Sequence, residues 1–286
     1  MEELDFEDLD RYLLKQNGKI IHQIWFGTIP NKKEASKAFE GMRKYRDSWL
    51  LKNPSWTYIS WNIDRCLELV KHHYAQHREM YDNYPYPIQK CDTIRYFILH
   101  RYGGLYADMD YYCNRPWDEV LQNYKNDIYL VETPNKLGKE KNIHISNSLM
   151  YSRPGHVFWS KLFIELEQNQ TLPLYYGRHI TIMFSTGPGI LNRVYNMYRT
   201  RYKLDHYPHK LFHPYGLTSD IITLNNKPNL YAVHIGKGSW ETKDSKILIF
   251  MYTEWKIILM IILVLIIPSL LYYLYTKISV KHNLST

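Results

Sequence analysis

The stretch that decides the fold is residues 91–113, CDTIRYFILHRYGGLYADMDYYC. Its first half repeats apolar side chains at helical spacing, which predicts a helix with one face in a core. These side chains are Ile94, Phe97, Ile98 and Tyr102. Asp92 stands ahead of them, at the position of an N-cap. Gly103 and Gly104 then end the helix, since glycine adopts the left-handed conformation that a helix end needs.

Two aspartates, Asp108 and Asp110, follow the short strand that is predicted after the glycines. Residues i and i+2 of a strand point to the same face, so these carboxylates need a positive partner. A divalent cation would supply it, because hard cations prefer oxygen ligands, and so would a nearby arginine. A lone D-x-D pair is also common in solvated turns. Asp92 and Arg95, one helical turn apart, form either a surface ion pair or a pair aimed at a ligand.

The composition limits the class of protein. With 286 residues, 45% of them hydrophobic, the chain is long enough for one sizeable α/β domain and a membrane segment. The net charge is +8, but no dense run of lysine and arginine occurs, so we expect no nucleic-acid partner. Three cysteines form no CxxC pair, which fits a reducing compartment. The acidic opening lacks the apolar stretch of a secretory signal.

The order of segments predicts four parts. Residues 1–18 form a short amphipathic arm, which either packs on the domain or stays mobile. Residues 19–245 alternate strand and helix patterns, which predicts an α/β domain with a mostly parallel sheet. Residues 257–275 carry no charge and are long enough to cross a bilayer, although a buried globular helix is the alternative. Residues 276–286 form a short tail.

Three blocks in this order resemble the D-x-D glycosyltransferases of family 32, the sugar-binding-region type. They are residues 21–27 (IHQIWFG), residues 53–61 (NPSWTYISW) and residues 92–96 with 103–110. The family includes inositol-phosphoceramide mannosyltransferases and initiating outer-chain mannosyltransferases. The resemblance covers residues 20–240.

This resemblance implies a fold and an activity. The expected fold is a GT-A-type, Rossmann-like nucleotide-binding domain. The expected activity is metal-dependent, retaining transfer of a hexose from a nucleotide-diphosphate sugar, with GDP-mannose favoured over a UDP-sugar. The acceptor would be a glycan, a glycolipid or a protein, and the cofactor Mn²⁺ or Mg²⁺.

The resemblance also implies roles at the central motif. Asp110 would hold the metal directly, and Asp108 would bind the metal, the ribose or both. Arg95 would add positive charge near the sugar or the phosphates. Tyr106 and Asp92 would orient the donor sugar through hydrogen bonds.

Three further residues are expected at the site by resemblance, each with an ordinary alternative. Trp25, at the end of the first strand, would stack on the nucleotide base or be a core tryptophan. Asn147 would lie near the sugar or the acceptor, or only fix the backbone. His234 would complete the metal ligands, since a neutral histidine is a good Mn²⁺ ligand, or contact phosphate, or anchor its loop.

Other functions remain as alternatives. One is a membrane-tethered carbohydrate-binding protein without turnover, which would need no diphosphate clamp. A metal-dependent hydrolase or nuclease would need a denser cluster of acidic and histidine residues. We expect a single-pass, C-terminally anchored membrane protein, with the catalytic domain facing the cytosol because of the flanking lysines and the missing signal. The anchor favours a lipid-linked acceptor, and a protein or a glycan is the alternative.

Overall fold

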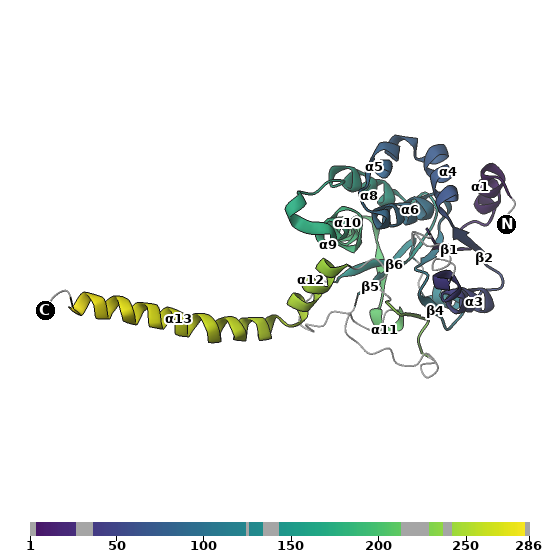
Figure 1. Ribbon diagram of the computed structural model, residues 1–286. Helices are drawn as coiled ribbons and strands as arrows, with labels where there is room; N and C mark the ends of the chain where they lie inside the picture. Colours follow the sequence, from purple (N-terminus) through teal and green to yellow (C-terminus); the bar gives the residue numbers. More distant parts are fainter. Residues whose placement is uncertain are drawn as a thin grey trace. The chain divides into compact units, whose positions relative to one another are not determined.

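The computed structural model describes residues 4–26, 37–123, 126–133, 143–212, 229–236 and 242–283. Within these ranges six strands form one sheet of order β2-β1-β3-β6-β5-β7. Figure 1 labels β1, β2, β5 and β6 of this sheet. They are β1 (Ile20–Ile24), β2 (Thr57–Trp61), β3 (Gly104–Ala107), β5 (Ile128–Glu132), β6 (Ile145–Ser152) and β7 (Asp205–Tyr207). Three of the five pairings are parallel, which confirms the expected α/β class with a mostly parallel sheet.

A second, two-stranded sheet lies beside the end of β3. It pairs β4 (Tyr111–Cys113) antiparallel with β8 (Ala232–His234). Tyr111 is opposite His234 in this register. The pairing therefore brings a residue from late in the chain next to the D-x-D motif.

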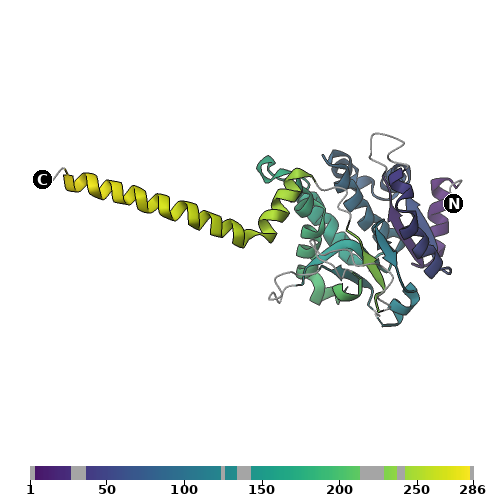
Figure 2. The same cartoon turned by 60° about the horizontal axis from the view of Figure 1, so that its bottom comes forward.

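Helices cover both faces of the large sheet (Figures 1 and 2). Those on one face include α4 (Ile63–His73), α6 (Pro87–Tyr102), α8 (Val157–Gln168) and α10 (Pro188–Tyr202), and those on the other include α3 (Arg43–Lys52), α7 (Trp117–Asn123) and α11 (His209–Phe212). The remaining described helices are α1 (Phe6–Lys15), α5 (Arg78–Asn83), α9 (Gly177–Ser185), α12 (Lys243–Thr253) and α13 (Trp255–Asn283), with 3-10 turns at Ala75–His77 and Leu174–Tyr176.

The strands alternate between two cores, as side chains of a pleated strand must. Tyr106 packs into the core under α6, whereas Leu105 and Ala107 belong to the core under α3 and α7. Both sheet faces are covered, which explains why β1 and β3 are buried along their whole length.

The predicted start of the central helix is wrong. α6 begins at Pro87, after the N-cap Tyr86, whose backbone N–H donates to the Gln89 side chain. Proline is favoured in a first helical turn because its missing N–H needs no partner there. Asp92 therefore lies inside the helix and is buried. Helix α6 is buried on most sides between 92 and 99, not along one stripe.

The predicted end of this helix is confirmed. α6 ends at Tyr102, and Gly103 and Gly104 have φ of +64° and +87°. A Cβ on Gly104 would lie 2.5 Å from the carbonyl oxygen of Ile20. The two glycines thus let β3 start directly beside β1, which places the following aspartates at the carboxyl end of the sheet.

The N-terminal helix α1 packs within the same compact unit as the sheet, which holds residues 1–176 and 180–238. Leu9 and Leu13 are buried. Asp10 accepts hydrogen bonds from Arg101 and from the Tyr102 hydroxyl of α6. These contacts join α1 to the central helix.

A second unit holds residues 177–179 and 239–286, and it contains α12 and α13. Among the described helices, α13 is the one that is long and apolar enough to cross a membrane. The candidate span is Trp255–Tyr275, 21 residues, none of which is buried. It includes the whole stretch that was expected at 257–275.

Candidate functional site

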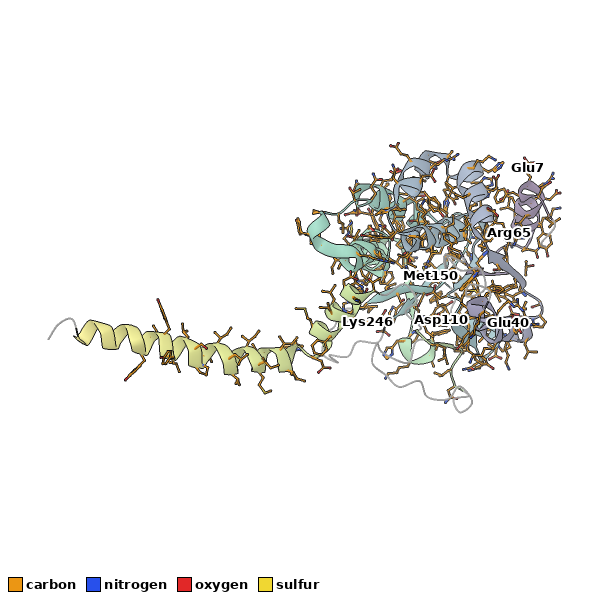
Figure 3. The ribbon with its side chains drawn as sticks, in the orientation of Figure 1. Glu7, Glu40, Arg65, Asp110, Met150 and Lys246 are labelled. Carbon is orange, nitrogen blue, oxygen red and sulfur yellow. The ribbon has the colours of Figure 1, made fainter. Side chains whose placement is uncertain are left out.

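Three side chains converge at the carboxyl end of the sheet. Asp108 and Asp110 lie in the turn between β3 and β4, and His234 ends β8 (Asp110 is labelled in Figure 3). Their ligand atoms all lie within 4.8 Å of one another. His234 Nε2 is 3.1 Å from Asp110 Oδ1 and 4.0 Å from Asp108 Oδ2. The two aspartates meet through a turn and not along a strand, because β3 ends at Ala107.

The electrostatics of this cluster favour an added positive charge. Burial raises the pKa of Asp108, and the nearby Asp110 carboxylate raises it further, while Arg95 opposes both. Burial lowers the pKa of His234, but its hydrogen bond to Asp110 and the two carboxylates outweigh this, so its pKa is raised. A proton on His234 or a bound cation satisfies the same need.

The donor set fits a divalent cation. Two carboxylates and one imidazole are suitable oxygen and nitrogen ligands for Mn²⁺, and carboxylates also suit Mg²⁺. The side chains keep 28%, 13% and 13% exposure for Asp108, Asp110 and His234, so the cluster is reachable from solvent. Three protein ligands leave positions for water or for a phosphate oxygen.

Arg95 is the buried cation that adjoins the cluster. Its guanidinium donates to Asp108 Oδ1 at 3.0 Å and pairs with Asp92 Oδ1 at 2.9 Å. It also donates to the backbone carbonyls of Cys91 and Asn147. Arg95 therefore has a fixed position with its charge held between two carboxylates, and the surface ion pair that the sequence left open is excluded.

Tyr106 fixes the orientation of Asp108. Its hydroxyl donates to Asp108 Oδ1 at 2.7 Å, and its ring lies under the Arg95 guanidinium at 4.7 Å. Asp108 Oδ1 thus accepts from both Tyr106 and Arg95. The other oxygen, Oδ2, is the one that faces His234.

Asp92 and Asn147 form a buried polar network behind Arg95. Asn147 Nδ2 donates to Asp92 Oδ1 at 2.9 Å, and the Thr186 hydroxyl donates to Asp92 Oδ2 at 3.2 Å. The Tyr96 hydroxyl donates to the Thr186 carbonyl and accepts from Asn147. Burial raises the pKa of Asp92 to about 6, although Arg95 lowers it. The structure thus places Asp92 and Asn147 together, beside the cluster and not in it.

Trp25 lies at the carboxyl end of β1, as expected. It is half-buried, its ring packs on Phe39 at 5.6 Å, and its backbone N–H donates to the Trp61 carbonyl. Within the described part of the chain, Trp25 thus contacts Phe39 and Trp61 and not the cluster.

Two residues that hold the cluster, Tyr111 and Gln23, were not predicted from the sequence. Tyr111 stacks on the His234 ring with centroids 4.5 Å apart and planes within 6°. Gln23 donates to the Asp108 carbonyl and accepts from the Tyr58 hydroxyl. Gln23, with His22, is one of two polar residues in a strand that is otherwise isoleucine, which was an available signal. Tyr111 carries no comparable signal, because its contact arises only from the β4–β8 pairing.

Known glycosyltransferases resemble this chain in sequence. Residues 40–127 match the family described as the glycosyltransferase sugar-binding region containing the DXD motif. The chain is 30% identical over 237 residues to the mannosyl phosphorylinositol ceramide synthase SUR1 of Saccharomyces cerevisiae, covering 80% of this chain and 53% of that protein. It is 29% identical over 245 residues to inositol phosphoceramide mannosyltransferase 3 of Schizosaccharomyces pombe, covering 84% and 60%. The chain thus spans little more than half the length of these curated relatives.

One solved structure that matches part of this chain is PaToxG glycosyltransferase. It covers 67% of this chain and 75% of its own, with 13% sequence identity and a TM-score of 0.44. The matched DXD segment contains Asp92, Arg95, Tyr106, Asp108 and Asp110. Over residues 40–127 the chain is therefore similar to glycosyltransferases with a DXD-containing sugar-binding region, and over most of its length to the two yeast relatives named above.

Proposed function

We propose that this protein is a retaining hexosyltransferase that uses a nucleotide-diphosphate sugar, with GDP-mannose as the favoured donor and a UDP-sugar as the alternative. The observation that carries the proposal is the convergence of Asp108, Asp110 and His234 beside the buried Arg95. The names of the two yeast relatives, a synthase and a mannosyltransferase, support the choice of mannose.

The cluster is suited to holding the donor's diphosphate through a cation. Asp110 and His234 would hold Mn²⁺ or Mg²⁺, together with Oδ2 of Asp108. When bound, the cation neutralises the charge that develops on the departing diphosphate. Asp108 Oδ1 stays with Tyr106 and Arg95, so the carboxylate cannot rotate away from the cluster.

Arg95 acts as a fixed positive charge near the phosphates or the donor sugar. The guanidinium does not have to move during the reaction, because four contacts already hold it in place. Asp92 and Asn147 position this guanidinium and orient the donor sugar. Trp25, at the same edge of the sheet, would stack on the base.

Transfer with retention of the sugar's anomeric configuration requires no dedicated protein base in this proposal. The acceptor attacks from the face that the departing diphosphate leaves, and a phosphate oxygen takes the acceptor's proton. The residues above therefore bind and orient, and none of them is assigned to proton transfer.

The acceptor is proposed to be a glycolipid at a membrane. Both relatives are named for inositol-containing ceramides, and the candidate span Trp255–Tyr275 would hold the chain at a bilayer. Three lysines lie on the N-terminal side of the uncharged stretch 257–275, and two lie on its C-terminal side. Because positive residues are enriched on the cytosolic side of a span, this difference favours a cytosolic catalytic unit. They are Lys243, Lys246 and Lys256, then Lys277 and Lys281.

A panel of nucleotide sugars with Mn²⁺, read by release of free nucleotide, tests the donor and the turnover. Asp110→Ala is expected to abolish release, whereas Asp64→Ala, at an exposed position on α4, should leave it unchanged. If the native protein binds glycans but releases no nucleotide from any donor, it is a carbohydrate-binding protein without turnover. Equal activity of Asp110→Ala and the native chain would refute the assigned site.

A further inference from the structure

Helix α12 exposes an apolar face that the proposed activity does not explain. Ile247, Phe250 and Met251 are 59%, 57% and 52% exposed. They follow i, i+3, i+4 spacing and so share one side of the helix. Lys243 and Lys246 are exposed on the same side, one turn nearer the N-terminus. The face therefore changes from basic to apolar along the helix.

The opposite side of α12 is already engaged within its own unit. Ser245 is buried, and its hydroxyl is 2.9 Å from His179 Nδ1. Asp244 accepts a hydrogen bond from the His179 backbone N–H. The buried Ser245 marks the engaged side, Asp244 lies at the edge of the apolar face, and the side away from Ser245 is the one with three large apolar residues.

The exposed face continues directly into the candidate membrane span. α12 ends at Thr253, Glu254 links the helices, and α13 begins at Trp255, where the span also begins. The apolar residues of α12 thus lie within one or two helical turns of the hydrocarbon boundary. Trp255 and Lys256 at that boundary are residue types that favour the headgroup region.

We propose that α12 is an interfacial helix, which lies in the headgroup layer of the bilayer that α13 crosses. Ile247, Phe250 and Met251 face the acyl chains, and Lys243 and Lys246 bind anionic headgroups. Amphipathic helices of this kind bury their apolar face about 5–10 Å into the boundary. This inference rests on the proposed membrane anchoring and adds a second, lipid-selective contact to it.

Photocrosslinking of the full chain in lipid nanodiscs tests the placement. Benzoylphenylalanine at position 250 is expected to form adducts with lipid acyl chains. The same probe at Leu263, within the span, is the positive control, and at Leu51, 77% exposed on α3, the negative control.

Each outcome separates the two proposals. Lipid adducts at 263 with none at 250, or with protein adducts at 250 instead, overturn the interfacial helix and leave the anchoring intact. An absence of lipid adducts at both positions overturns the anchoring, and the interfacial helix with it. Adducts at 250 and 263 but not at 51 are the expected result.

Neutralising the lysines tests the headgroup contact. Each basic residue near an anionic surface contributes about 1 kcal/mol, or about fivefold in binding. In nanodiscs that mix anionic and zwitterionic lipid, the native adduct at 250 should be enriched in anionic lipid. Lys243→Gln with Lys246→Gln should return the adducts to the bulk lipid ratio. Enrichment that persists in the double variant, or is absent from the native chain, would show that these lysines do not select lipid.

Discussion

Replacing Arg95 with methionine would leave two carboxylates, Asp92 and Asp108, without the cation that lies between them. Arg95 and Asp92 are only 5% and 6% exposed, so water cannot take over the lost contacts. Removing one partner of a buried ion pair costs about 3–5 kcal/mol, because the other charge stays buried and unpaired. For a unit of this size, that corresponds to a fall of about 6–20 °C in Tm.

The matched control is Arg78→Met. Arg78 forms an ion pair with Asp82 at a similar distance, 3.2 Å, but its side chain is 60% exposed. Exposed pairs contribute about 0–1 kcal/mol, so this variant should melt close to the native protein. The assay is thermal unfolding of the detergent-solubilised chain, followed by tryptophan fluorescence, together with nucleotide release from the donor.

The cost should depend on pH. Asp92 has a pKa of about 6 beside Arg95, and loss of the guanidinium would raise it further. At pH 5.5 the carboxyl group of the variant is protonated and uncharged, so Arg95→Met should lose less stability there than at pH 7.5. The buried-pair reasoning is wrong if Arg95→Met melts at the same temperature as Arg78→Met. It is also wrong if Arg95→Met loses the same amount of stability at both pH values.

Three further predictions concern the residues around this pair. Tyr111→Leu, which removes the ring stacked on His234, should weaken Mn²⁺ binding in titration calorimetry by about tenfold, while Tyr111→Phe should bind as the native protein does. The native protein should lose about 3 kcal/mol of unfolding free energy as pH rises from about 4 to above 6, because folded Asp92 (pKa about 6) keeps a proton that the unfolded group (3.8) has lost. Asp92→Asn should reduce this loss by that amount in denaturant titrations, while Asp108 and His234, whose pKa values are also raised, keep their own contributions. An unchanged loss in the variant would show that Asp92 does not contribute. Gly104→Ala should lower the free energy of unfolding by more than about 4 kcal/mol, because its Cβ would lie 2.5 Å from a backbone carbonyl oxygen of β1. Gly155 also has a positive φ but faces open space, so Gly155→Ala should lower it by only about 1–2 kcal/mol in the same titrations.

Much of the local structure could be read from the chain alone. The Gly103-Gly104 pair predicted where α6 ends, because few other residues adopt positive φ. Uncharged residues over 257–275 predicted a helix with the length of a membrane span. The spacing of Asp108 and Asp110 predicted neighbouring carboxylates. Each of these features depends on residues a few positions apart, which is the range over which sequence patterns act.

The burial of Asp92 could not be read in this way. Its side chain suits an N-cap, but Pro87 and Gln89 start the helix one turn and a half earlier. A buried carboxylate is stable only if its partners are present, and two of them, Asn147 and Thr186, come from distant segments. Local propensity therefore favoured the cap, and tertiary contacts decided against it.

The sequence by itself predicted the α/β class, the resemblance to DXD glycosyltransferases and the residues of the D-x-D motif. The tertiary structure decided how those residues form a site. His234 reaches Asp110 across 124 positions only because β8 pairs with β4. Tyr111 stacks on the imidazole for the same reason. A metal-ligand set needs its atoms within a few ångströms, and for residues so far apart in the chain that distance is set by strand pairing.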